Sequence, residues 1–352
     1  MQLARAHCPI EIDADVHLAL YSEEQHKEKK NMINPKISVI IPTYNRPDKL
    51  HRALVSVLSQ SYRNFETIIV DDSESSITGD MLEGFRRAQS DVLRYFKREE
   101  RKGVASARNF GVNVSSGELI AFLDDDDEWL PNKLERQINI IDKSSRKTGV
   151  VHCNCFVVND NKKYLYHTNM LKDQSLDRLL EFDFVANSTA LIRKECFEQV
   201  GFFDERMAYG EDWDFYIRVA KKFEFRYLHE PLATMHWDKG GAPRLSVDLE
   251  KKTRGYQIII NKHWQEFEKR KRTLAQYATI IGSSLCRMTE YKRGRQYLIM
   301  AYKVYPLSIV PLLLLATNSP ISESRIFQRA KQVISKSALN EKVTSAHYFG
   351  AR

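Results

Sequence analysis

The sequence predicts an α/β protein with a doubly wound, mostly parallel sheet and a helical, basic C-terminal extension. Short apolar segments alternate with segments of helical periodicity through roughly 120 residues, which is typical of an open parallel sheet. Several apolar segments end in polar or acidic residues, most markedly Gly117–Leu130, where GELIAFL runs into four consecutive aspartates. Beyond about residue 250 the pattern is helical and rich in Lys and Arg.

The first predicted elements form a βαβ unit. The segment ISVII, which begins at Ile37, is short and apolar, and the turn PTYNRP follows it. Residues 50–58 then carry apolar side chains at helical spacing, and a second strand at 67–70 ends in Asp71 and Asp72. Because strands joined in this way are parallel, we expect both carboxyl ends at the same edge of the sheet.

The same alternation continues toward the C-terminus. A glycine turn and a helix, RKGVASARNFGV, precede the Asp-terminated strand, which is expected over 118–123. Acidic residues in a first turn favour a helix that opens at Gly210 and runs to about Lys222. The other expected elements are helices at about 80–89 and 134–141 and strands at about 92–96, 149–158, 187–193 and 225–228.

Length and composition are those of a soluble globular protein. Of the 352 residues, 43% are hydrophobic and 28% are charged, so a substantial core is expected. The five cysteines show no metal spacing and no disulfide framework, which fits a reducing compartment. No signal pattern opens the chain, and the apolar run at 306–317 is shorter than the roughly 20 residues that cross a bilayer. We therefore expect a cytoplasmic protein.

The positive charge is concentrated near the C-terminus. The net charge is +8, but residues 251–352 carry about 19 Lys and Arg against about 5 acids, which leaves the preceding part net acidic. We expect an N-terminal appendage at 1–35, a catalytic domain at 36–250 and the basic extension at 251–352. Basic residues beside the apolar run at 306–316 suit peripheral contact with an anionic membrane at its cytoplasmic face. A helical bundle packed on the catalytic domain is the alternative.

Asp124–Asp127 are the strongest chemical signal in the chain. They follow a predicted strand, and ligands bind at the carboxyl ends of strands in open α/β sheets. Carboxylate oxygens suit Mg²⁺ or Mn²⁺, which proteins often hold through one or two carboxylates together with water and substrate phosphates. The alternative is a solvated acidic turn before the next helix, where Asp is also favoured.

Two more groups are expected at the same edge of the sheet. Pro42, Tyr44 and Asn45 follow the first strand, and Asp71 and Asp72 follow the second. An aromatic ring offers a face on which a base stacks, and a carboxylate accepts a hydrogen bond from a base N–H group. The alternative is that these residues form only a turn and the polar end of a strand, with no role in ligand binding.

Phosphate recognition is expected to depend on cations. The first strand is followed neither by G-x-G-x-x-G nor by a P-loop sequence, so phosphate charge must be met by a metal and by basic side chains. Arg108 has the fork of donors that suits a phosphate. An arginine on a surface helix is the alternative interpretation.

Six segments, in their order along the chain, resemble those of the family 2 glycosyltransferases. They are VIIPTYNRP, IIVDDSE, GVASARNFGV, GELIAFLDDDDEWLPNKLE, VGFFDE and GEDWDF, within about residues 36–245. The resemblance implies the GT-A fold and an inverting enzyme that uses a nucleoside diphosphate sugar and Mn²⁺ or Mg²⁺. It implies a donor such as a UDP-sugar, and a glycan or a lipid-linked sugar as the acceptor.

The resemblance also implies roles for individual residues. Asp124 and Asp126 match the D-x-D pair of the family, with Asp126 the expected direct metal ligand, and Asp212 matches the catalytic base. His236 resembles in position a residue near the diphosphate and is a further candidate metal ligand, although a packed histidine is as good an interpretation. The expected nucleotide-binding residues are Pro42, Tyr44, Asn45, one or both of Asp71 and Asp72, Arg108, Asp124 and Asp125.

Two other classes of function fit less well. A sugar nucleotidyltransferase would carry a glycine-rich basic loop after the first strand, and PTYNRP holds no glycine. A polyanion or nucleic-acid binder acting through residues 251–352 would leave the aspartates without a role, so no nucleic-acid partner is expected.

Overall fold

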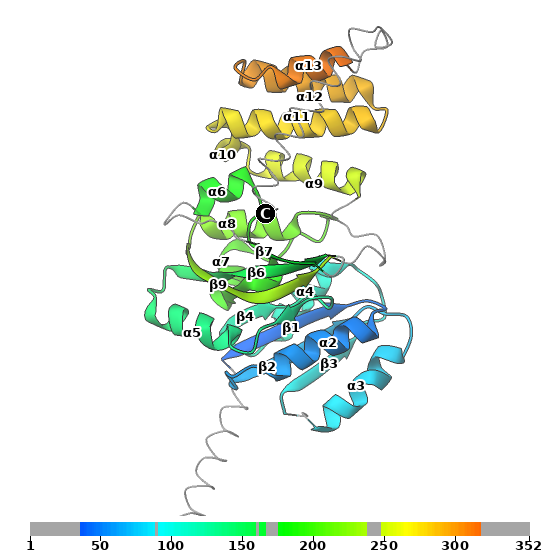
Figure 1. Cartoon of the computed structure of the whole chain (residues 1–352), viewed down its shortest axis with the longest axis vertical. Helices are drawn as coiled ribbons and strands as arrows, with labels where there is room; N and C mark the ends of the chain where they lie inside the picture. The colour runs from blue at the N-terminus through cyan, green and yellow to red at the C-terminus, as the bar shows by residue number, and fades with distance from the viewer. Residues whose placement is uncertain (1–35, 89–90, 160–161, 167–174, 238–247, 318–352) are drawn as a thin grey trace, which may run out of the picture.

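The computed structural model describes residues 36–88, 91–159, 162–166, 175–237 and 248–317. The expected appendage at 1–35 and the end of the chain from residue 318 lie outside these ranges. Figure 1 shows a sheet flanked by helices, with the C-terminal helices stacked at one end of the molecule. The predicted α/β class and the helical extension are both confirmed.

The described strands form one sheet in the order β3-β2-β1-β4-β8-β6-β9-β5, and β7 pairs with β6. The first four are parallel neighbours, β6 and β9 are also parallel, and β8 runs antiparallel between β4 and β6. The strands are β1 (Ile37–Thr43), β2 (Phe65–Asp71), β3 (Leu93–Lys97), β4 (Leu119–Phe122), β5 (Glu128–Trp129), β6 (Thr148–Asn159), β7 (Lys162–Tyr166), β8 (Ala190–Arg193) and β9 (Glu224–His236).

Helices cover both faces of the sheet, as a doubly wound fold requires. Every residue of β1 and β2 is buried, because their alternate side chains enter two separate cores. The helices in one core are α2 (Pro47–Leu58), α3 (Ile77–Ala88) and α5 (Lys133–Lys143). The helices in the other core are α4 (Val104–Val114), α6 (Ser175–Glu181), α7 (Lys194–Val200) and α8 (Glu211–Ala220).

Two predicted strands have different bounds in the structure. The segment expected as a strand at 187–193 begins with the 3₁₀ turn η1 (Asn187–Thr189), where the Thr189 hydroxyl donates to the carbonyl of Ala186 and holds the turn. The strand expected at 225–228 continues to His236 as β9. It passes Pro231 because the register with β6 shifts there, and a proline is tolerated at such an irregularity.

The C-terminal helices pack directly on α8. Ile259 belongs to the same core as Phe215 of α8, and a Cβ on Gly255 would lie 2.5 Å from the carbonyl oxygen of Tyr209. None of the described helices is both long and apolar enough to cross a membrane. These helices are α9 (Leu249–Lys262), α10 (Trp264–Glu268), α11 (Lys271–Arg287), α12 (Tyr291–Val304) and α13 (Val310–Thr317).

Candidate active site

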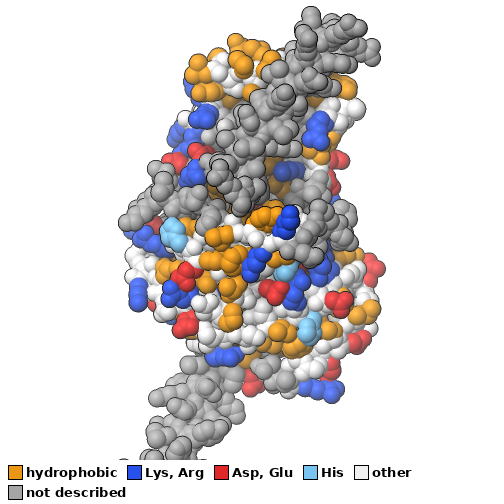
Figure 2. Space-filling view, in the orientation of Figure 1, with side chains coloured by type: hydrophobic (Ala, Val, Ile, Leu, Met, Phe, Trp, Pro, Cys, Tyr) orange, Lys and Arg blue, Asp and Glu red, His pale blue; other side chains and the backbone are white. Residues whose placement is uncertain are grey.

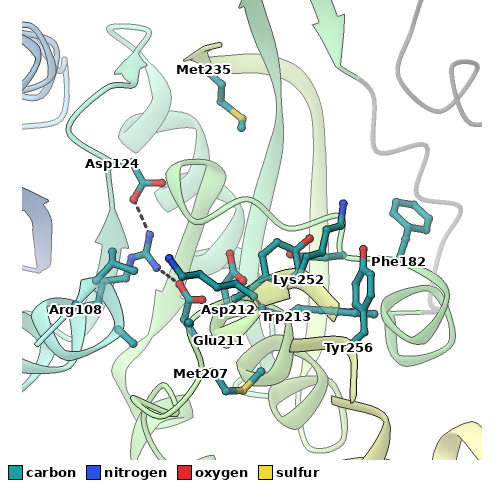
Figure 3. Close-up of a pocket in the computed structure, with 18 of the residues that line it drawn as sticks. Arg108, Asp124, Phe182, Met207, Glu211, Asp212, Trp213, Met235, Lys252 and Tyr256 are labelled. Atoms are coloured by element: carbon teal, nitrogen blue, oxygen red, sulfur yellow. Dashed lines mark hydrogen bonds and ion pairs between the residues drawn. The ribbon is translucent and has the colours of Figure 1, made fainter. Parts of the chain in front are cut away.

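A large groove lies where the strand ends meet the C-terminal helices. Its volume is about 2460 Å³. One wall is formed by the residues after β1 and β4 and by the start of α4, and the opposite wall by α9, α11 and the α12–α13 connection. The first turn of α8 lies between the two walls, and Figure 3 shows Asp212 there, with Arg108 on one side and Lys252 on the other.

The turn after β1 is held against its neighbours by hydrogen bonds. The Thr43 hydroxyl donates to the Asp125 carboxylate (2.8 Å). Asn45 adopts a left-handed backbone conformation with φ of 53°, which asparagine tolerates, and its N–H donates to the Ser73 hydroxyl (2.7 Å). The Tyr44 ring lies in the groove with the Arg101 guanidinium 3.9 Å from its centroid.

The four consecutive aspartates have different environments. Asp125 and Asp127 are buried. Burial raises the pKa of Asp125 to about 6 against the opposing effect of Arg46, and burial together with the charges of Asp124 and Asp126 raises the pKa of Asp127. The Ser188 hydroxyl donates to Asp127 (2.7 Å). Asp124 and Asp126 are the two that keep exposed carboxylate surface in the groove.

Basic side chains of the protein lie within ion-pair distance of the aspartates. The Arg46 guanidinium lies 3.3 Å from Asp126 and 3.2 Å from Asp125, and the Lys49 ammonium lies 4.0 Å from Asp126. Within the described ranges, no three His, Cys, Asp or Glu side chains converge as ligands of one ion. Carboxylates such as Asp124 and Asp126 are of the type that can contribute one or two ligands to a divalent ion, when water and substrate phosphates supply the others.

Arg108 joins the aspartate cluster to α8. Its guanidinium donates to Asp124 (2.7 Å) and to Glu211 (2.9 Å), as Figure 3 shows. The side chain is only 5% exposed, and the charges of both carboxylates raise the pKa of Arg108 against the effect of burial. Arg108 lines the groove and so lies where a phosphate could reach it.

Asp212 is the second residue of α8, and both Asp212 and its neighbour Glu211 line the groove. One carboxylate oxygen accepts from the backbone N–H of Trp213 (2.9 Å), and the other lies 3.4 Å from the amide nitrogen of Asn187. Burial and the charge of Glu211 raise the pKa of Asp212 to about 7, while Arg108 acts in the opposite direction. A carboxylate with this pKa is suited to accept a proton near neutral pH.

Asn187 and Tyr216 are site residues that sequence reasoning missed. The buried Tyr216 hydroxyl donates to the Asn187 side-chain oxygen (2.9 Å), which orients the amide so that its nitrogen faces Asp212. Asp212 and Tyr216 are four residues apart on α8 and thus share a helix face. Asn187 belongs to a distant turn, so no local sequence signal could have linked the three.

The two aspartates after β2 differ in access to the groove. Asp71 is fully buried and accepts from the Ser73 N–H (2.8 Å) and the Tyr95 hydroxyl (2.8 Å), and it is absent from the groove lining. Asp72 lines the groove, and both of its oxygens accept from the Arg98 guanidinium. Of the two predicted nucleoside ligands, only Asp72 is placed to face a ligand.

His236 lies at the end of β9, next to the aspartate cluster. Its imidazole is 2.6 Å from the Glu128 carboxylate, and its backbone N–H donates to Asp127 (3.3 Å). The residues on either side of it, Met235 and Trp237, line the groove, whereas His236 does not. Its predicted role as a metal ligand stays a prediction.

The model of the glycosyl transferase family 2 matches residues 38–201, which hold the first wall of the groove. The chain carries a family 2 glycosyltransferase domain. It is 31% identical over 210 residues to an uncharacterised glycosyltransferase of Rickettsia typhi, a match that covers 58% of this chain and 64% of the relative. It is 26% identical to the GalNAc(5)-diNAcBac-PP-undecaprenol beta-1,3-glucosyltransferase of Campylobacter jejuni, over 56% of this chain and 63% of that one. The match thus spans less than two thirds of either relative.

Solved glycosyltransferases have the same fold. The S. aureus TarS 1-349 structure in complex with UDP-GlcNAc superposes with a TM-score of 0.60, is 18% identical and covers 86% of this chain and 92% of its own. The mannosyltransferase PcManGT from Pyrobaculum calidifontis, in complex with GDP-Man and Mn²⁺, superposes with a TM-score of 0.54 at 16% identity, over 88% and 89% of the two chains. The predicted GT-A-type glycosyltransferase fold is confirmed.

Proposed function

We propose that the protein transfers a sugar, with inversion, from a nucleoside diphosphate sugar to an acceptor hydroxyl. The observation that carries the proposal is that Asp212 and the aspartate cluster line the same groove, one wall of which lies in the stretch that matches the family 2 glycosyl transferase model. Displacement of the diphosphate by the acceptor hydroxyl in one step requires the general base and the diphosphate site to lie in the same groove.

The wall with Tyr44, Asp72 and Arg108 would bind the donor. Tyr44 offers an aromatic face, and Asp72 is the one of the two aspartates that lines the groove, so these two are our candidates for contact with the base. Pro42 and Asn45 shape the same turn. TarS was solved with UDP-GlcNAc, and a UDP-sugar is accordingly the donor that we propose.

Asp126 and Asp124 would hold Mn²⁺ or Mg²⁺ on the diphosphate. Both line the groove and retain exposed carboxylate surface, and PcManGT was solved with Mn²⁺. A divalent ion there would supply positive charge for the leaving diphosphate. Asp125 is instead tied to Thr43 and Arg46, so its role would be to hold the turn after β1 in place.

Asp212 would act as the general base. The acceptor oxygen attacks the anomeric carbon, the bond from that carbon to the diphosphate oxygen breaks, and Asp212 takes the hydroxyl proton. Glu211 is less suited because its carboxylate already accepts from the buried Arg108. Positioned general-base catalysis typically contributes about 10²- to 10⁴-fold to the rate.

The acceptor would be a glycan or a lipid-linked sugar. The relative from Campylobacter jejuni is named for an undecaprenol-linked acceptor, and that from Erwinia amylovora for amylovoran biosynthesis. The basic extension would also permit peripheral contact with an anionic membrane.

A thermal-shift panel of nucleoside diphosphate sugars, with and without Mn²⁺, tests the donor and metal parts of the proposal. A ligand at a hundred times its Kd stabilises the folded state by about 2.7 kcal/mol, which is measurable. We expect stabilisation by a UDP-sugar that grows with Mn²⁺. No stabilisation by any nucleotide sugar would contradict the proposed function.

A further inference from the structure

In the groove wall opposite the proposed donor-binding residues, the side chains change from cationic to apolar with distance from Asp212. Figure 1 shows α8, α9, α11 and then the α12 and α13 pair stacked in that order away from the sheet. Lys252 lines the groove from α9 and Arg272 from α11, whereas Leu307 lines it from the α12–α13 connection and Val310 from the start of α13. The wall is therefore cationic near the reaction centre and apolar farther away.

Of the three cations of this wall that line the groove, Lys252 and Arg272 have no acidic partner among the described residues. Lys252 lies 5.8 Å from the ring centroids of both Tyr209 and Tyr256. Across the described ranges, neither Lys252 nor Arg272 makes an ion pair, whereas Lys251, next to Lys252, lies 3.3 Å from Asp248. Cationic side chains that line a groove without a carboxylate partner suit an anionic ligand.

α11 presents one continuous face to the groove. Arg272, Gln276 and Ile280 line it at intervals of four residues, which places them on one side of the helix over roughly 12 Å. The face runs from a guanidinium through an amide to an apolar side chain that is 44% exposed. The side chains of α11 that line the groove therefore change from charged to apolar along the helix, as those of the whole wall do.

Exposed apolar side chains occur at Leu307, which lines the groove, and at two nearby positions in the sequence that do not line it. Leu307 is 82% exposed, Ile309 64% and Leu312 41%. Figure 2 shows hydrophobic side chains gathered at the end of the molecule where Figure 1 places α12 and α13. An exposed apolar patch that continues a groove is a feature of ligand or membrane contact.

We propose that this wall binds an acceptor saccharide carried on a lipid through a phosphate or diphosphate, with Lys252 and Arg272 on the phosphate and Leu307 on the hydrocarbon. The inference rests on the proposed function, because it takes the saccharide end to lie at Asp212. It follows from charge complementarity, since the order sugar, phosphate and hydrocarbon matches the order of Asp212, cations and apolar residues along the groove.

Calorimetry on the full chain, in EDTA and saturating UDP, tests the proposal with farnesyl diphosphate and inorganic diphosphate as probes. We expect farnesyl diphosphate to bind at least about tenfold more tightly than inorganic diphosphate, because the hydrocarbon adds apolar contact. The Lys252→Gln/Arg272→Gln double variant should weaken farnesyl diphosphate at least about tenfold, since contacts between charged groups are lost. Leu307→Asp should weaken farnesyl diphosphate and leave inorganic diphosphate unchanged.

Matched controls exclude a general effect of charge or of surface polarity. Arg254→Gln/Lys271→Gln removes the same net charge from α9 and α11 at positions outside the groove lining, and Ile77→Asp alters a remote side chain that is 59% exposed. Both controls should bind farnesyl diphosphate as the wild type does. UDP binding, measured separately with Mn²⁺, should be equal in all variants. A wild-type protein that binds no UDP in the presence of Mn²⁺ would refute the proposed function rather than this inference.

Two results would overturn the inference. The first is equal affinity of the wild type and the Lys252→Gln/Arg272→Gln variant for farnesyl diphosphate. The second is flotation with vesicles of phosphatidylglycerol and phosphatidylcholine that depends on Leu307 without measurable binding of farnesyl diphosphate. That second result would make the apolar end a membrane-docking surface instead of an acceptor site.

Discussion

The Arg108 guanidinium lies 2.9 Å from the Glu211 carboxylate and so joins α4 to the first turn of α8. The same guanidinium contacts Asp124 at the end of β4, and both Arg108 and Glu211 are buried. Two adjacent acids of α8 therefore have different tasks. Both acids line the groove, but Glu211 is paired with Arg108, which links the helix to the strand ends, whereas Asp212 accepts from the Trp213 backbone.

Replacement of Arg108 should destabilise the fold. Arg108→Gln leaves the buried Glu211 carboxylate without its cation, and removal of one partner from a buried pair costs about 3 to 5 kcal/mol. Urea unfolding measures this change. Arg136→Gln, which breaks an exposed pair with Glu230, should leave the midpoint nearly unchanged, and equal midpoints for the two variants would contradict the structural role of Arg108.

Replacement of Asp212 should remove turnover and spare binding. Asp212→Asn should lower kcat at least about a hundredfold, because the proposed proton acceptor is lost, while the affinity for UDP stays near that of the wild type. Glu211→Gln should instead lower the thermal midpoint and keep more of its turnover. An Asp212→Asn enzyme that retains more than about a tenth of wild-type kcat would remove Asp212 from the mechanism.

Activity should rise with pH through the pKa of Asp212. The base works only when deprotonated, and burial beside Glu211 raises the pKa of Asp212 to about 7. The value of kcat/KM for the acceptor should therefore be low at pH 6 and level off above about pH 8. A profile that stays flat down to about pH 5 would show that the base titrates with an ordinary carboxyl pKa.

Loss of the Tyr216 hydroxyl should shift the same profile. Tyr216→Phe leaves the Asn187 amide free to turn away from Asp212, so the ionised carboxylate is less stabilised and its pKa rises. We expect the acid limb to move up by about half a pH unit. Tyr227→Phe is the matched control, since it deletes a hydroxyl that donates to Asn154 away from the groove. Identical profiles for the two variants would refute an orienting role for Tyr216.

The neighbouring aspartates Asp125 and Asp126 should respond differently to substitution. Asp126→Asn should nearly abolish the effect of Mn²⁺ on UDP binding, because a metal ligand is lost. Asp125→Asn should have a milder effect on that dependence, since Asp125 is tied to Thr43 and Arg46. Titration calorimetry with UDP and Mn²⁺ measures both, and an Asp126→Asn protein with undiminished metal dependence would show that other groups hold the ion.

Several features of this protein followed from the sequence alone. The α/β class, the strand ends that carry Tyr44 and Asp124, and the helix that begins at Glu211 were all readable, because apolar periodicity and helix-entry residues are local properties. The order of the motifs along the chain indicated the glycosyltransferase family. The basic, helical character of the extension was equally visible in composition.

Only the tertiary structure decided which of these residues meet. Asp71 is buried, whereas Asp72 lines the groove. Glu211 is paired with Arg108, and Asp212 is not. Asn187 and Lys252 come to the same site from segments far apart in the chain. The physical reason is that a carboxylate acquires its role from burial and from the charges around it. Those surroundings come from packing between distant elements, and a linear pattern does not contain them.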